Sequence, residues 1–350
     1  MDIKSRMFGL DLLRSIAIIL VVITHSSFLF QKFATPNNFH LPDGVDLFFV
    51  LSGYLVGTIL IKTINEHQRF DFSLAINFLK RRWFRTLPNY FLFLLLNIVL
   101  ISFGLIKGTI NKYLITYFFF FQNFHKPYDF LFWESWSLSI EEWFYLLFPL
   151  AMLLLFKVTK MKAKQIILTT ILAFILFPFL YRVYQSGHDL NLDLFFRRLV
   201  MTRLDAIGYG LLAAYIHWYY PAFWNKTKNV FFVLGLMMLT FLMTGSIKSV
   251  FVQETFYFTF TGLSIMLLLP RLESWKAESV PLKTFQFLSK ISYSIYLVHI
   301  PLLQVISKFI APEIEGAFLL YGFFWFVTIA LSFIIYTTFE KPMMDLRDRE

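Results

Sequence analysis

Long apolar runs separated by short polar segments recur along the whole chain. We interpret ten of these runs as membrane-spanning helices, because each residue of a helix adds about 1.5 Å and each run is almost free of charge. The predicted spans are residues 10–30, 45–61, 87–106, 143–156, 166–181, 204–218, 230–245, 251–269, 285–306 and 317–339. The pattern predicts an all-α, polytopic transmembrane helix bundle, with residues 1–350 as a single integral-membrane domain.

Composition and charge support a membrane protein. Hydrophobic residues make up 58% of the chain and charged residues 15%, which is too few charges for a soluble domain of this size. The net charge of +10 is explained by topology: with a cytoplasmic N-terminus, inner segments hold roughly twice as many Lys and Arg residues as outer ones. We therefore predict that both termini are cytoplasmic and that nucleic acid is not a partner. Cysteine is absent, which excludes thiol catalysis and thiolate metal sites.

The first apolar run carries ionisable residues that a simple membrane anchor does not need. Arg14 and His25 are eleven positions apart, which is three helical turns plus roughly 20°, so they share one face. They lie about 16 Å apart along the axis, and Asp11 is spaced to pair with Arg14. Such residues in a membrane favour a functional site. A snorkelling arginine and a hydrogen-bonded histidine explain the same pattern structurally.

The second predicted span begins near Asp46 and contains Gly53 and Gly57. Small residues four positions apart allow two helices to approach closely, so these glycines predict a tight helix–helix contact. That structural role is compatible with Asp46 lying near a site at the outer face of the membrane.

A basic cluster precedes the third predicted span. Lys80, Arg81, Arg82 and Arg85 occupy about one and a half helical turns, and Pro88 follows as the expected start of the span. Like charges this close repel unless an anion lies among them, and arginine binds phosphate oxygens in a bidentate manner. Topogenic charge and lipid headgroups explain the cluster as naturally.

An aromatic and acidic segment precedes the fourth span. It places Glu141 and Glu142 at the mouth of an apolar helix, among aromatic residues that include Trp136. A helix dipole and an interfacial aromatic belt account for this pattern. One carboxylate can satisfy that structural role while its neighbour faces inward.

Two later spans also carry polar side chains. Arg203 and Asp205 open the sixth span, where pairing with Arg197 or Arg198 is the structural explanation. In the ninth span a polar stripe follows the helical period, through Ser292, Tyr296 and His299. A single histidine in such a stripe is more often a hydrogen-bonded core residue than a catalyst.

Together these segments resemble the acyltransferase-3 family of integral-membrane O-acyltransferases. Each motif is weak alone, but they follow the family order over nearly the whole chain. They are Arg14 with His25, the Gly-Val-Asp run 44–54, Arg82 and Arg85 with Pro88, the Trp-Ser-Leu-x-x-Glu segment 136–145, the Arg-Leu-Asp segment 203–210, segment 291–299 and Phe-Glu-Lys-Pro at 339–342. Some similar proteins carry an added esterase-like domain, which we do not expect here.

The resemblance implies transfer of an acyl group, usually acetyl from acetyl-CoA, to a hydroxyl of an envelope or exported glycan or glycolipid. It also implies the bacterial cytoplasmic (inner) membrane and no metal. We expect catalysis from His25, Arg14 and Glu141, and donor binding from Arg14, Arg81, Arg82 and Arg85. The expected acceptor-binding residues are Asp46, Trp136, Glu142, Arg203 and His299.

His25 suits a general base, because its ordinary pKa of about 6.5 is near working pH. A covalent acyl-histidine that carries the group across the membrane is the alternative mechanism. A transporter or flippase of a lipid-linked saccharide also fits intramembrane charges, but matching broken helices in paired halves are absent from the sequence. A non-catalytic scaffold leaves the shared face of Arg14 and His25 unexplained. The acceptor and the oligomeric state are not specified by the sequence.

Overall fold

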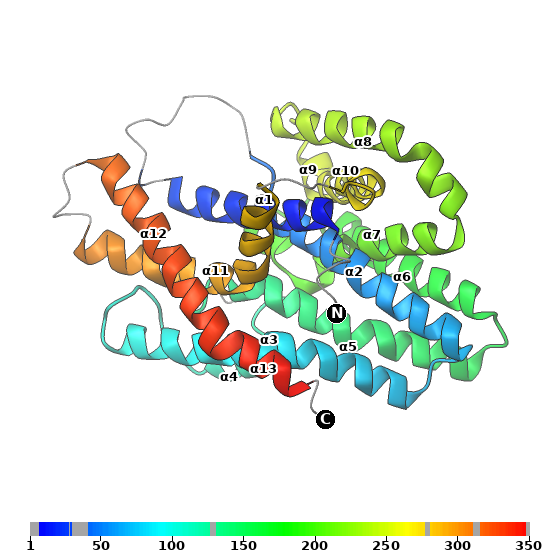
Figure 1. The fold of residues 1–350 in the computed structure, drawn as a ribbon, viewed down its shortest axis with the longest axis horizontal. Helices are drawn as coiled ribbons and strands as arrows, with labels where there is room; N and C mark the ends of the chain where they lie inside the picture. The colour runs from blue at the N-terminus through cyan, green and yellow to red at the C-terminus, as the bar shows by residue number, and fades with distance from the viewer. Residues whose placement is uncertain are drawn as a thin grey trace.

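The computed structural model describes residues 7–27, 29, 41–126, 131–276, 281–310 and 316–347. These residues form helices and the segments between them, and they contain no β-strand. Figure 1 shows the helices packed into one bundle. In chain order they are α1 (Phe8–Ser26), α2 (Gly44–His67), α3 (Phe72–Ser102), α4 (Leu114–Phe118), α5 (Ser135–Val158), α6 (Ala163–Gln185), η3 (Leu192–Arg197), α7 (Val200–Tyr219), α8 (Pro221–Met243), α9 (Val250–Glu254), α10 (Phe256–Glu273), α11 (Pro281–Phe309), α12 (Ala317–Ile335), η4 (Tyr336–Glu340) and α13 (Lys341–Arg347).

The predicted all-helical, polytopic class is confirmed, and every predicted span coincides with a helix over most of its described length. Within the described residues, seven segments are long and apolar enough to cross a membrane. They are α1, α2, α3, α5, α6, α8 and the segment Phe318–Leu346. Spanning by α7, α10 and α11 stays a prediction, as does the cytoplasmic side of both termini. Residues 1–6, 31–40 and 348–350 lie outside the described part of the chain.

Three predicted helix starts are wrong, and all three helices begin earlier. Helix α8 starts at Pro221 rather than residue 230, and the other two are α3 and α5. Helix α3 starts at Phe72 rather than residue 87, because the Asp71 side chain caps it by accepting from the Leu74 amide at 3.0 Å. The basic cluster is therefore helical, and Pro88 lies inside α3 rather than at its start. Helix α5 starts at Ser135 rather than at residue 143, so Glu141 and Glu142 lie in its second turn.

Helix α2 is the most buried of the candidate membrane helices and packs tightly against α7. A Cβ atom built on Gly53 would lie 2.0 Å from the Ile207 carbonyl oxygen, and one on Gly210 equally close to the Val50 carbonyl oxygen. A Cβ on Gly57 would lie 2.9 Å from Ala214 Cβ. The predicted tight contact through Gly53 and Gly57 is confirmed, and α7 is its partner.

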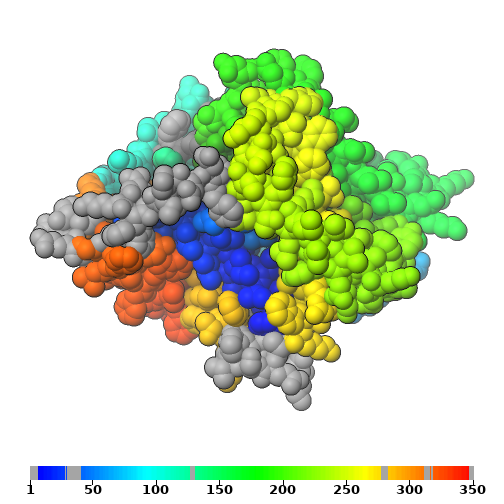
Figure 2. Space-filling model, turned by 90° about the horizontal axis from the view of Figure 1, so that it is seen from above, coloured from blue at the N-terminus to red at the C-terminus, as the bar shows by residue number. Residues whose placement is uncertain are grey.

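Helices α1 and α11 are held together by hydrogen bonds near their cytoplasmic ends, as the predicted topology orients them. Ser289 Oγ donates to Asp11 Oδ1 at 2.6 Å, and Ser15 Oγ donates to the Phe285 carbonyl oxygen at 2.7 Å. Figure 2 shows α1 in blue between α12 on one side and α8 to α10 on the other. This pairing fixes which residues of α11 face the functional side chains of α1.

The segment before α5 folds back against it. Asn123 Nδ2 donates to the carbonyl oxygens of Trp136, at 2.9 Å, and Arg198, at 2.6 Å. The Phe120 carbonyl oxygen accepts from Ser139 Oγ at 2.6 Å and from Trp143 Nε1 at 2.8 Å. These bonds anchor the start of α5, and with it the glutamates of its second turn.

Candidate active site

A cavity of about 410 Å³ lies between α1, α2, α3, α5 and α11. On α1 it reaches from Met7 to Arg14, the half that the predicted topology places toward the cytoplasm. Four of the predicted site residues line it, although they come from three separate helices: Arg14, Arg82, Arg85 and Glu141. The structure therefore brings three of the four expected donor-binding arginines and the expected catalytic glutamate to one place.

Glu141 lies in a field of positive charge inside this cavity. The charged groups that act on its carboxylate are the guanidinium groups of Arg85, Arg82 and Arg14. Tyr145, one helical turn further along α5, donates its hydroxyl to Glu141 Oε2 at 3.3 Å and lies 2.7 Å from Ser52 Oγ of α2. The lining holds two carboxylates, of Asp11 and Glu141, against three guanidinium groups. It therefore stays net positive, which favours an anionic ligand.

Two residues expected at this site do not line the cavity. Arg82 and Arg85 are three positions apart and share a face of α3, whereas Arg81 is turned by about 100° and is exposed to the surroundings. Glu142 is buried, and its Oε1 accepts from Thr86 Oγ1 at 2.6 Å. Of the two adjacent glutamates, Glu141 faces the cavity and Glu142 holds α5 against α3.

His25 belongs to a second constellation, beyond the cavity lining. Its Nδ1 lies 2.9 Å from Nε2 of His299, on α11. The charged groups that act on His25 are Arg197, Asp43, Arg198 and Asp193. The predicted pair of Arg14 and His25 therefore shares one helix face but contributes to two neighbouring sites.

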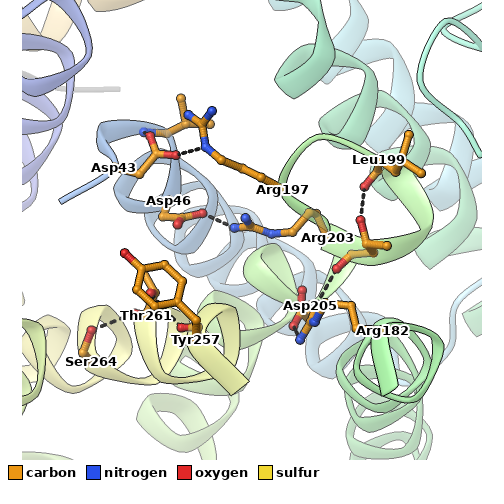
Figure 3. Close-up of polar contacts among 12 residues, drawn as sticks. Asp43, Asp46, Arg182, Arg197, Leu199, Arg203, Asp205, Tyr257, Thr261 and Ser264 are labelled. Carbon is orange, nitrogen blue, oxygen red and sulfur yellow. Dashed lines mark hydrogen bonds and ion pairs between the residues drawn. The ribbon is translucent and has the colours of Figure 1, made fainter. Parts of the chain in front are cut away.

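The charges beside His25 form a partly exposed network, of which Figure 3 shows the pair of Asp43 and Arg197. Arg197 bridges Asp43 and Asp193, with N–O distances of 2.7 Å to each, and Arg198 also pairs with Asp193. Burial acts to raise the pKa of Asp43, but the Arg197 guanidinium outweighs it and holds that pKa below its usual value. The same balance of burial and Arg197 lowers the pKa of Asp193. Both carboxylates are thus ionised at neutral pH.

Sequence reasoning missed the two carboxylates of this network. Asp43 directly precedes the Gly44-Val-Asp46 segment and caps α2, with its side chain accepting from the Val45 amide at 2.9 Å. Asp193 lies four residues before Arg197, a spacing that permits an ion pair on a helical turn. The cap position and this spacing were the signals in the sequence.

The five residues expected to bind an acceptor are all buried: Asp46, Trp136, Glu142, Arg203 and His299. Asp46 and Arg203 form an ion pair with each other, and the Arg203 guanidinium lies 4.4 Å from the centroid of the Phe258 ring. The Trp136 ring lies under the Arg197 guanidinium at 5.0 Å. These residues are therefore part of the packed interior of the bundle rather than of an open surface.

The structural explanation considered for the Arg203 segment, pairing with Arg197 or Arg198, is wrong in its partners. Arg203 pairs with Asp46, and Asp205 Oδ2 accepts from Arg182 of α6 at 2.7 Å (Figure 3). Arg182 is fully buried and also donates to the Thr255 carbonyl oxygen at 3.2 Å. The pairing differs because α7 runs between α2 and α6, which place their own charges against it.

A bundle of membrane helices around a cationic cavity, with a histidine pair beyond it, fits a membrane-embedded enzyme that handles an anionic substrate. The family described as acyltransferase domain, the acyltransferase-3 family, matches residues 7–337. The chain therefore belongs to the acyltransferase-3 family, as its motifs indicated.

Related proteins are named for the same chemistry. The O-acetyltransferase OatA of Staphylococcus aureus strain NCTC 8325 / PS 47 is 28% identical over 96% of this chain and 57% of its own length. A protein of S. aureus strain COL, named as a candidate O-acetyltransferase, is 24% identical over 95% of this chain and 56% of its own. The chain thus spans a little over half the length of these relatives. No solved structure matches it.

Proposed function

We propose that this chain transfers an acetyl group from acetyl-CoA on the cytoplasmic side to a hydroxyl of an envelope glycan or glycolipid. The observation that carries the proposal is the cavity in which Arg14, Arg82, Arg85 and Glu141 meet, next to the helix face that carries His25. Family membership and the names of the relatives support O-acetyl transfer.

The cavity suits the donor. Acyl-CoA carries its negative charge on phosphates, and arginine binds phosphate oxygens with charge-assisted hydrogen bonds. Ser137 and Tyr296 lie in the cavity wall, and the Tyr296 ring centroid is 5.7 Å from that of His299. An extended pantetheine arm held by the arginines would bring its thioester along this wall toward His25.

The reaction needs one base and no redox partner. His25 removes the proton of the acceptor hydroxyl as the oxygen attacks the thioester carbonyl. The new C–O bond forms, the C–S bond breaks, and the thiolate of CoA takes the proton back from the imidazolium. No group of three or more metal-ligating side chains occurs in the described part of the chain, and none is required by this scheme.

The acceptor meets His25 from the outer face in this proposal, next to the network of Asp43, Asp193, Arg197 and Arg198. Carboxylates and guanidinium groups hydrogen-bond to sugar hydroxyls, and the side chains of Asp193 and Arg197 are 45% and 27% exposed. The site then spans the bundle, with donor and acceptor arriving from opposite sides of a bacterial inner membrane.

The test is transfer of radiolabelled acetyl from acetyl-CoA to a glycan or oligosaccharide acceptor by the purified protein in detergent, with free CoA measured in parallel. Equal release of CoA and acetylated sugar supports the proposal. A lipid-linked saccharide flippase releases no CoA, so its signature is saccharide movement in vesicles without acetyl transfer. Stoichiometric radiolabel on His25 before the acceptor is added would replace the direct-transfer scheme by an acyl-histidine scheme.

A further inference from the structure

Two histidines from opposite ends of the chain meet edge to edge. His25 on α1 is half-buried, and His299 on α11 is fully buried. Their ring centroids are 5.1 Å apart with an interplanar angle of 29°, while Nδ1 of His25 lies only 2.9 Å from Nε2 of His299. Because the centroid distance exceeds the N–N distance by about two ring radii, the nitrogens point at each other. This is the geometry of a hydrogen bond between the rings.

The other nitrogen of His299 decides which ring donates. Its Nδ1 lies 2.6 Å from the Tyr296 carbonyl oxygen and 3.2 Å from that of Ile295. A carbonyl oxygen only accepts, so the proton of neutral His299 is on Nδ1 and its Nε2 holds a lone pair. His25 must then donate Nδ1–H to His299, and the lone pair of His25 is on Nε2.

We propose that His299 is a positioning residue that fixes His25 as the tautomer with a free Nε2, and that Nε2 is the atom that removes the acceptor proton. This inference rests on the function proposed above and assigns His299 a role different from acceptor binding. A carbonyl, a histidine and a second histidine form a relay in which each group orients the next.

The relay also stabilises the charged form of His25 during the reaction. When Nε2 of His25 accepts the proton of the acceptor hydroxyl, Nδ1–H of His25 stays hydrogen-bonded to the lone pair on Nε2 of His299. That lone pair is occupied by this bond, so His299 does not compete with His25 for the hydroxyl proton. The charges facing His25 are Asp43 and Asp193, which stabilise the imidazolium, and Arg197 and Arg198, which oppose it. His299 thus holds the ring in place while the network balances its charge.

Helix α11 links this relay to the donor cavity. Tyr296 supplies the carbonyl oxygen that orients His299, and its side chain lies in the cavity wall. The Tyr296 hydroxyl lies 2.7 Å from Ser137 Oγ and donates to the Glu134 carbonyl oxygen at 3.0 Å. These bonds fix the turn of α11 between the cavity and the histidine pair, so the ring of His299 has a rigid support.

The test compares His299→Gln with His299→Leu. The amide oxygen of glutamine can accept from His25 Nδ1 near the position of the lost Nε2, whereas leucine keeps the volume and removes the acceptor. We expect His299→Leu to lower kcat for acetyl transfer by about tenfold or more, with KM for acetyl-CoA unchanged. His299→Gln should recover a large part of the loss. Ser294→Ala is the matched control, because Ser294 is buried on the same helix and donates to Glu340 rather than to either histidine.

A second readout does not depend on activity. In protein labelled with ¹⁵N-histidine, the His25 resonances should show Nδ1 protonated and Nε2 unprotonated, and His299→Leu should give a mixture of both tautomers. An unchanged His25 tautomer in folded His299→Leu, or wild-type kcat in that variant, overturns the inference. If the wild-type protein transfers no acetyl group, the proposed function fails, and the resonances still test the geometry.

Discussion

Arg14 and His25 share one face of α1, yet they face different neighbours. Arg14 lines the cavity with Arg82, Arg85 and Glu141, whereas His25 bonds to His299 beyond that cavity. The separation of about 16 Å along the helix explains how one helix can serve two sites. Donor binding and proton transfer should therefore respond separately to mutation.

His25→Asn should strongly reduce acetyl transfer and leave acetyl-CoA binding intact. Asparagine can still hydrogen-bond to a neighbour, so the fold should persist, but transfer should fall by about a hundredfold or more, the usual loss for a positioned base. The measurements are acetyl transfer, acetyl-CoA affinity and thermal stability of the same preparations. A stable variant that transfers at the wild-type rate would remove His25 from the mechanism.

The arginines of the basic cluster in α3 should differ in their effect on acetyl-CoA binding according to the helix face on which they lie. Arg82→Ala and Arg85→Ala should each weaken acetyl-CoA binding by about tenfold or more, since a charge-assisted hydrogen bond contributes about 1.5–3 kcal/mol. Arg81→Ala is the control, because its side chain is exposed outside the cavity. The measurement is the affinity of each variant for acetyl-CoA, determined by calorimetry. Equal losses for all three variants would mean that general positive charge, and not the cavity, attracts the donor.

The contact between α2 and α7 should tolerate no side chain at its closest point. Gly53→Ala places a Cβ 2.0 Å from the Ile207 carbonyl oxygen, so the helices must separate and the melting temperature should fall by several degrees. Gly322→Ala in α12 is the matched control, with nothing within 4 Å of its Cβ, and should be neutral or slightly stabilising. Similar melting temperatures for the two variants would contradict the tight contact.

The ion pair of Asp43 with Arg197 should make part of the stability depend on acid. The folded-state pKa of Asp43 lies below its usual value because Arg197 outweighs burial. A depressed carboxyl pKa adds stability that is complete above the unfolded value of about 3.9 and disappears as pH falls through the folded value. Asp43→Asn keeps the helix cap, so its melting temperature should be lower than wild type at pH 7 and converge with it in acid.

A matched change tests whether this dependence belongs to the pair of Asp43 and Arg197. Asp71 also caps a helix, and its pair with Arg69 is exposed, with an N–O distance of 3.2 Å. Asp71→Asn should alter stability little at any pH, because exposed pairs contribute about 0–1 kcal/mol. A difference for Asp43→Asn that stays constant down to the acid limit would point to a lost contact rather than a lost charge.

Single cysteines can test topology, because the chain contains none. The charge distribution predicts that Lys160→Cys is labelled only from the cytoplasm and Lys112→Cys only from outside. The experiment uses a membrane-impermeant maleimide on intact cells and on inverted vesicles. Labelling of position 160 from outside intact cells would invert the bundle and place the cationic cavity on the wrong side for cytoplasmic acyl-CoA.

Hydrophobic length and helical period determine local features of this protein without any tertiary information. They place ten helices in order, put Arg14 and His25 on one face, and mark Gly53 and Gly57 as a contact surface. The polar starts of α3 and α5 escaped this reasoning, because a charged stretch ends an apolar run without ending a helix. Once this stretch is known to be helical, the helical repeat places Arg82 and Arg85 on one face of α3 and Arg81 on another.

The partners of the buried charges and histidines were decided only by the packing of the helices. His25 meets His299 across 274 positions of sequence, and Asp46 meets Arg203 across 157. Nothing in the spacing within one helix encodes such a pair, because its formation depends on which helices are neighbours and how each is rotated. The sequence by itself therefore determined the helices, the family and the types of residue at the site. The tertiary structure decided that the cavity arginines and the histidine pair, to which we assign donor binding and proton transfer, occupy two adjoining places. Only the packed bundle sets the distances between side chains on different helices.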